Sequence, residues 1–229
     1  MAKENLKEQE KLHQEKVEEG LSAVETFFNE NKKIIWGSIA AIIAAGAIVL
    51  SYQKFYVQPK RVEGQAQMFP AEANFRAQEY NLALNGDGNV LGFAQIAEEY
   101  GAKAGKSVYL YAGICELKLG NYENALSYLK KYNGKDEILA AKALAYQGEA
   151  YTGLEKYKEA LVAFEKAASK ADNIFAASYL LKAGNLCEEI GDKAKALSFY
   201  KKVKDQYPQS MEAYDVDKYI SRIENAPAE

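Results

Sequence analysis

The stretch "LKLGNYENALSYLKKY", residues 117–132, joins a turn to an amphipathic helix. The turn carries Gly120, and after it Ala125, Leu126 and Leu129 recur at the three- and four-residue spacing that places side chains on one face of a helix. One such hairpin is an ordinary helical element, whereas a repeated hairpin defines an architecture. The fold therefore depends on whether this pattern recurs along the chain.

Three copies of the hairpin align on a column of glycines, Gly113, Gly148 and Gly184, which lie 35 and 36 residues apart. Five further columns keep a small or apolar residue type in all three copies. They are Tyr109, Leu144 and Leu180; Leu119, Leu154 and Ile190; Ala125, Ala160 and Ala196; Leu126, Leu161 and Leu197; and Leu129, Phe164 and Tyr200. A constant period with constant residue types predicts an all-α solenoid of stacked hairpins.

Each column has a physical interpretation. The small residues allow the two helices of a hairpin to approach closely, and the large apolar residues fill the space around that crossing. Gly120 and Gly191 follow the first helix of their copies, where a left-handed residue commonly ends a helix. Glu155 occupies this position in the middle copy, without the conformational freedom of glycine.

The pattern resembles the tetratricopeptide repeat, a helix–turn–helix unit of about 34 residues. The resemblance places the copies at residues 106–140, 141–176 and 177–212. Pro208 falls where that family often has proline at the end of the second helix. Lys193 departs from the pattern, because Tyr122 and Tyr157 supply an aromatic residue at this turn position in the other copies.

A weaker fourth copy is predicted upstream, from about residue 70 to 105. Its first helix is "NFRAQEYNLAL" and its second is "VLGFAQIAEEY", in which Phe93 and Ile96 match the apolar columns. The repeat domain is then 70–212, and residues 213–229 form a capping helix and tail. A solenoid requires such a cap because its last hairpin otherwise exposes its stacking face.

A transmembrane helix is predicted at residues 34–52, "IIWGSIAAIIAAGAIVLSY", which contains no charged residue. At about 1.5 Å per residue, 19 residues span about 28 Å, close to the bilayer core. Trp36 and Tyr52 lie near its ends, where interfacial aromatics belong. An uncleaved signal anchor fits better than a cleaved signal peptide, because the 33 residues before it are too many and are net acidic.

The segments around the predicted anchor are short. Residues 1–33 form a charged tail, whose second half has Val17, Leu21, Val24 and Phe28 at helical spacing. Residues 53–69 form a juxtamembrane connector, in which Pro59 is expected to break or kink the helix. Within the anchor, Gly37, Ala41 and Ala45 share a face on which another membrane helix could pack, although small residues are common in membrane helices anyway.

A protein-binding groove is predicted on the concave side, which the first helix of each copy lines in this repeat family. Its expected residues pass from apolar to acidic along the solenoid, which suits a peptide or helix with an apolar anchor and a basic flank. They are Leu110, Ile114, Leu117, Lys118, Glu149, Thr152, Leu181, Asn185 and Glu188. The alternative is that the C-terminal helix of the chain itself fills this groove.

Catalysis, cofactors and metals find no support in the sequence. The single histidine, His13, and the two distant cysteines, Cys115 and Cys187, assemble neither a zinc site nor a histidine-based triad. Both cysteines are interpreted as small core residues. No glycine-rich phosphate loop is present. With a net charge of −3 and no basic block, nucleic acid is not an expected partner.

The order of parts, a short tail, one membrane helix and about four repeats over residues 20–225, resembles the bacterial ancillary SecYEG translocon subunit family (YfgM-like). The resemblance implies a single-pass protein of the bacterial inner membrane, with a cytoplasmic N-terminus and a periplasmic repeat domain. It implies partners among translocon subunits, a periplasmic chaperone or client polypeptides. Residue spacing itself predicts only an anchored, non-enzymatic, protein-binding scaffold. A structural adaptor in another envelope or organelle membrane assembly remains the alternative, and self-association is left open.

Overall fold

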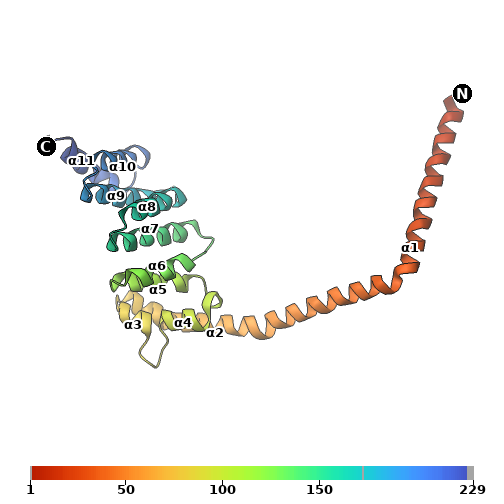
Figure 1. Cartoon of the computed structure of the whole chain (residues 1–229), viewed down its shortest axis with the longest axis horizontal. Helices are drawn as coiled ribbons and strands as arrows, with labels where there is room; N and C mark the ends of the chain where they lie inside the picture. Colours follow the sequence, from red (N-terminus) through yellow and green to blue (C-terminus); the bar gives the residue numbers. More distant parts are fainter. Residues whose placement is uncertain (1, 172, 226–229) are drawn as a thin grey trace. The chain divides into compact units, whose positions relative to one another are not determined.

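The computed structural model describes residues 2–171 and 173–225, and within them it is 82% helical with no strand. The chain divides into two compact units, Met1–Gln58 and Pro59–Glu229. The all-α architecture predicted from the repeat pattern is confirmed. Figure 1 shows the helices of the second unit stacked as successive layers.

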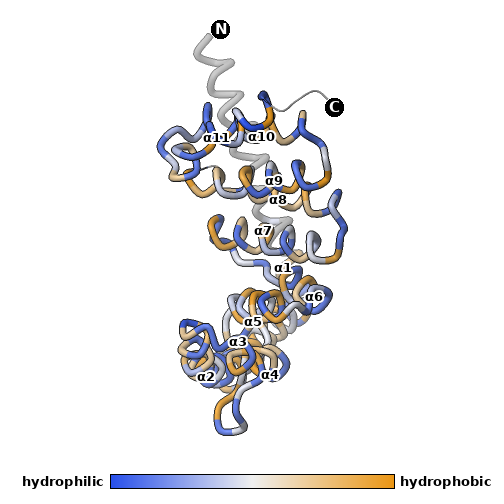
Figure 2. The backbone as a smooth tube through the Cα atoms, turned by 90° about the vertical axis from the view of Figure 1, so that its left-hand side faces the viewer, coloured by the Kyte–Doolittle hydropathy of each residue, from blue (hydrophilic) through white to orange (hydrophobic). Residues whose placement is uncertain are grey.

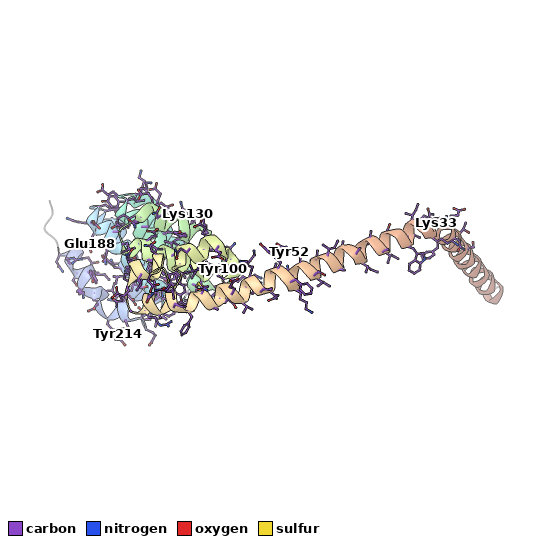
Figure 3. All side chains as sticks on the ribbon, turned by 90° about the horizontal axis from the view of Figure 1, so that it is seen from below. Lys33, Tyr52, Tyr100, Lys130, Glu188 and Tyr214 are labelled. Carbon is purple, nitrogen blue, oxygen red and sulfur yellow. The ribbon has the colours of Figure 1, made fainter. Side chains whose placement is uncertain are left out.

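The first unit is a long helix, α1 (Ala2–Tyr52), followed by a single π-helical segment, η1 (Gln53–Val57). Its apolar side chains project freely between the labelled Lys33 and Tyr52 (Figure 3), and Trp36, Ile42 and Leu50 are all more than 60% exposed. The helical run Thr26–Arg76 is long and apolar enough to cross a membrane. The side chains of residues 1–21 and 23–25 lie outside the described part, and with them the prediction at Val17, Leu21 and Val24.

The predicted break at Pro59 is wrong. Helical structure continues from η1 into α2 (Gln58–Arg76), and the π-helical segment η1 lies just before Pro59, whose missing N–H interrupts the regular hydrogen-bond ladder of the run. Pro70, expected near the start of the repeats, lies inside α2. One face of α2 is buried through Gly64, Met68 and Ala71, so the second unit begins with packed helix instead of a free connector.

The predicted fourth copy is not a regular hairpin. The stretch "NFRAQEYNLAL" is interrupted after Arg76, where Gln78 adopts a left-handed conformation (φ 63°), and the chain resumes as the short α3 (Tyr80–Asn85). After a loop come α4 (Phe93–Glu99) and the 3-10 turn η2 (Gly101–Lys103). Phe93 and Ile96 are fully buried, in agreement with their assignment to the apolar columns.

Three full hairpins follow, in the order expected of the repeats. They are α5 (Ser107–Lys118) with α6 (Tyr122–Lys131), α7 (Glu137–Gly153) with α8 (Tyr157–Ala171), and α9 (Ala176–Glu189) with α10 (Lys193–Gln206). Successive hairpins pack through α6 on α7 and α8 on α9. Apolar and polar residues alternate along each helix of the stack (Figure 2), as expected of amphipathic helices with one buried face.

The glycine column marks the close crossing inside each hairpin. A Cβ atom built on Gly113 lies 2.6 Å from Leu129, and one on Gly148 lies 2.7 Å from Phe164; on Gly184 it collides with the ring of Tyr200. The alanine column is fully buried in all three copies. These contacts confirm the close approach inferred from the column of small residues.

The three hairpin turns share one hydrogen-bonding pattern. The N–H groups of Asn121, Lys156 and Asp192 donate to carbonyls five residues earlier, at 2.9, 2.9 and 2.8 Å. The residue before each donor has a positive φ, which is 81° at Gly120 and Gly191 and 59° at Glu155. The middle hairpin therefore makes the same turn with a residue that has a Cβ atom.

The last helix, α11 (Met211–Glu224), packs on α9 and α10. Ser210 begins it as an N-cap, with its hydroxyl accepting a hydrogen bond from the N–H of Ala213. Val216 and Ile220 are buried in the core of the third hairpin, whereas Tyr214, labelled in Figure 3, is 83% exposed.

Candidate functional site: a groove across three hairpins

A cavity of about 450 Å³ opens across all three hairpins. Helix α5 and the start of α6 form one side, the last turns of α7 form the middle, and α9 forms the other side. The lining residues are Leu117, Lys118, Tyr122, Glu149, Thr152, Gly153, Phe164, Lys182, Asn185, Leu186 and Glu189. Its volume lies within the range of about 300–1,000 Å³ common for binding sites.

The floor of the cavity is apolar. Leu117, Phe164 and Leu186 are each less than 10% exposed, so they present only part of their surface to the opening. The ring of Tyr122 lies against the backbone of Gly153, where a Cβ atom would collide with it. This contact holds the first hairpin against the end of α7 and fixes the shape of the floor.

The charged groups of the cavity divide into a pair and two single charges. The Lys182 Nζ atom lies 2.6 Å from the Glu149 Oε1 atom, which links α9 to α7 across the middle of the cavity. Lys118 on α5 and Glu189 on α9 are both exposed. Neither of these two side chains has an ion-pair or hydrogen-bond partner among residues 2–171 and 173–225.

The structure brings together five of the nine predicted groove residues. Leu117, Lys118, Glu149, Thr152 and Asn185 all line the cavity. The Thr152 hydroxyl donates to the carbonyl of Gly148 at 3.0 Å, and Asn185 Oδ1 lies 2.8 Å from the Tyr200 hydroxyl, so local polar contacts hold both side chains.

The remaining four predicted residues are elsewhere. Leu110 and Ile114 are 3% and 4% exposed and lie in the core between the first two hairpins, in one cluster with Leu129 of α6 and Ala143 of α7. Leu181 is half-buried against the core of the third hairpin. The groove therefore does not begin with an apolar surface.

Glu188 also differs from its expected role. Its Oε2 atom accepts a hydrogen bond from the buried Tyr200 hydroxyl at 2.6 Å, and Arg222 of α11 binds the same carboxylate through two nitrogen atoms (Glu188 is labelled in Figure 3). Burial, followed by this hydrogen bond, raises the pKa of Tyr200. The acidic end predicted for the groove is thus largely neutralised by the chain itself.

Helix α11 does not occupy the cavity. The lining residues, over the part of the chain that the structure describes, include none from α11, which packs instead on α9 and α10. Within the described residues, the C-terminal helix therefore leaves the cavity open, although its Arg222 binds Glu188 of the predicted groove. Within the same residues, no cluster of three His, Cys, Asp or Glu side chains could hold a metal ion.

Five lining side chains lie outside the nine predicted groove residues, namely Tyr122, Phe164, Lys182, Leu186 and Glu189. Two of them stood in repeat columns, Tyr122 as the turn aromatic and Phe164 opposite the glycine, and both were interpreted as packing only. The signal for Lys182 is its place two residues before Gly184. The equivalent residues of the other copies are Tyr111 and Tyr146, large side chains on the same helix face.

Stacked hairpins, a close glycine crossing in each and a groove along one side define a helical-repeat scaffold. Comparison with known families agrees, because a family model described as tetratricopeptide repeat matches residues 107–135 and 178–210. The chain therefore contains tetratricopeptide repeats, which are typical of protein–protein interaction scaffolds. A search of curated proteins gave no significant match to the sequence.

Proposed function

We propose that the protein is a membrane-anchored scaffold that binds other polypeptides in the groove between its hairpins. The observation that carries this proposal is the cavity across three repeats, with an apolar floor and two charges that no described residue neutralises. Such a surface offers apolar contact and charged groups that fix orientation.

The anchor in this proposal is the apolar run at residues 34–52. Its support is the length and exposure of the helical run Thr26–Arg76, since none of its most apolar window is buried. Exposed apolar surface of this extent is unfavourable in water and favourable in a lipid bilayer. The short N-terminal tail then lies in the cytoplasm and the repeats lie outside.

The finer proposal is that the repeats stand in the periplasm of a bacterial inner membrane and assist protein translocation or chaperone hand-over at the Sec translocon. Its support is the order of parts, which resembles the ancillary translocon subunit family, together with the repeats themselves. The partners are then translocon subunits, a periplasmic chaperone or emerging client chains.

Co-purification tests the scaffold and its partners together. The full-length chain, solubilised in mild detergent, is expected to retain translocon subunits or a periplasmic chaperone, and Thr152→Arg is expected to lose them by filling the cavity. Ser127→Arg, on the exposed surface of α6 outside the cavity, is the matched control and should retain them. Equal recovery with both variants contradicts groove binding, and recovery of neither partner class contradicts the translocon role.

Protease treatment of spheroplasts tests the topology independently. External protease is expected to degrade the repeats while leaving residues 1–33 inside the membrane-protected fraction. Repeats that stay protected until the membrane is dissolved contradict a periplasmic domain and favour an adaptor that faces the cytosol.

A further inference from the structure

The two cavity charges that have no partner among the described residues, Lys118 and Glu189, have opposite signs and lie on different hairpins. Lys118 belongs to the last turn of α5 in the first hairpin, and Glu189 to the last turn of α9 in the third. The second hairpin stands between them and contributes Glu149, Thr152 and Gly153 to the cavity. A ligand that crosses the groove therefore meets a cation at one side and an anion at the other.

The middle of the groove disfavours a charged ligand group. Glu149 and Lys182 already neutralise each other at 2.6 Å, and Glu149 is the less exposed partner, at 27%. A charge placed there has to separate this pair and leave one of its members unpaired in a partly desolvated site. Leu117, Phe164 and Leu186 instead offer apolar contact beneath the same opening.

From this arrangement we infer that the groove selects a polypeptide segment with an acidic residue at one end, apolar residues in the middle and a basic residue at the other end. The acidic end lies against Lys118 and the basic end against Glu189. This inference rests on the proposed function, because it names the chemistry of the segment bound at the same site. It replaces the expectation of a purely basic flank, since Arg222 has already taken the Glu188 carboxylate.

Charge-reversal variants of the full chain in nonionic detergent test the inference, with fluorescent peptides as probes. Four probes share a two-leucine centre and differ in the charges of their ends. The first has an acidic N-terminal and a basic C-terminal end, and the second has the reverse order. The third has two acidic ends and the fourth has two basic ends. The first two cover both chain directions. The wild-type chain is expected to bind the better of these two about three- to tenfold more tightly than either probe with like charges, because exposed charge pairs contribute modestly to affinity and more to specificity.

Each charge-reversal variant is expected to replace the preference for unlike ends by a preference for like ends, and the two variants should prefer opposite charges. Lys118→Glu makes both sides of the groove acidic and should favour the probe with two basic ends. Glu189→Lys makes both sides basic and should favour the probe with two acidic ends. Lys166→Glu on α8 and Glu98→Lys on α4 change the same charges at exposed positions outside the cavity, and should leave the wild-type order unchanged. Raising the salt concentration should reduce every preference, because it screens exposed charges.

The outcomes separate the inference from the proposed function. Binding of all four probes with equal affinity, abolished by Thr152→Arg, overturns the inference and leaves groove binding in place. An order of affinities that the two cavity variants fail to change also overturns it. If no probe binds and Thr152→Arg has no effect on co-purification, both the inference and the groove function are wrong.

Discussion

The middle hairpin and its two neighbours have the same structure but follow the repeat pattern to different degrees. The family match covers residues 107–135 and 178–210, which are the first and third hairpins, and leaves the second outside. The second hairpin nevertheless has the same turn hydrogen bonds and the same glycine crossing, with Gly148 against Phe164. The crossing and its packing therefore specify this fold more strongly than the residues of the turn.

Substitution of the glycines at the helix crossings is expected to have the largest effect on the free energy of unfolding. The size of the loss should differ between the three hairpins. Glycine-to-alanine substitution places a Cβ atom against Leu129, Phe164 or Tyr200. We expect Gly184→Ala to cost the most, because polar contacts of the Tyr200 hydroxyl with Glu188 and Asn185 hold its ring in place, and Gly113→Ala the least, because a leucine can change rotamer. Overpacking of this kind costs about 1–3 kcal/mol, measured as the free energy of unfolding in urea.

A double substitution sharpens this result in the middle layer. Phe164→Leu leaves room for the new methyl group, so the pair Gly148→Ala and Phe164→Leu should be less destabilised than the sum of the single changes. Additive losses contradict a direct contact between the two positions.

Tyr200→Phe gives the third layer the side chain that the middle layer has in Phe164. It removes a hydroxyl that donates its one proton to the charged Glu188 at 2.6 Å and lies 2.8 Å from Asn185 Oδ1, and a hydrogen bond to a charged group contributes about 1.5–3 kcal/mol. Because Arg222 continues to bind Glu188, we expect a loss near the lower end of that range. Hydrogen exchange should increase in α9 and α11 and remain unchanged in α5 and α6. Equal increases throughout the stack contradict a local network.

The turn of the middle hairpin gives a smaller effect, in the opposite direction. Glu155 is left-handed at φ 59°, which costs a residue with a Cβ atom about 1 kcal/mol. Glu155→Gly is therefore expected to raise the free energy of unfolding by about that amount, whereas Glu155→Ala should not. Gly191→Ala, at the equivalent position of the third hairpin, is the control in the reverse direction and should lower the free energy of unfolding by a similar amount. No gain from Glu155→Gly indicates that the glutamate side chain itself stabilises the turn.

Ionisation of the buried tyrosines changes the stability of the fold only in alkaline solution. Burial is the main cause that raises the pKa of Tyr200 above its ordinary value of 10, and the same cause raises the pKa of Tyr100 to about 12. Above pH 10 the unfolded chain loses these protons while the folded chain keeps them, so the folded state binds more protons and stability falls as the pH rises. Urea midpoints should fall as the pH is raised through this range, and Tyr200→Phe should reduce the slope. A slope that Tyr200→Phe leaves unchanged contradicts the contribution of this hydroxyl.

Features that depend on the spacing of residues within one repeat could be predicted from the sequence. Contacts between residues of different repeats could not. The glycine and alanine columns required only constant spacing, and they identified all three hairpins. Burial of Leu110 and Ile114 depends on how the second hairpin stacks on the first, because both side chains lie in one cluster with Ala143 and Ala150 of α7. The left-handed Gln78 that interrupts the first helix of the fourth copy has no distinctive sequence signal.

The position of the groove could be predicted, but the pairing of its charged side chains could not, for the same reason. Lys182 pairs with Glu149 from 33 residues away, and Arg222 pairs with Glu188 from 34 residues away. The first pair joins two repeats and the second joins the third repeat to the capping helix, so their formation depends on how successive helices stack. Helix periodicity within one copy places each side chain on a face, but it does not identify its partner on the next layer.

Photo-crosslinking in intact cells tests the central claim, that the groove of the three hairpins binds polypeptide, most directly. A photoreactive residue at Lys118 lies on the cavity and one at Ser127 lies on the exposed surface outside it. The account predicts discrete protein adducts from position 118, lost on addition of Thr152→Arg, and none of the same adducts from position 127. Identical adducts from both positions, or adducts from position 118 that survive Thr152→Arg, contradict it.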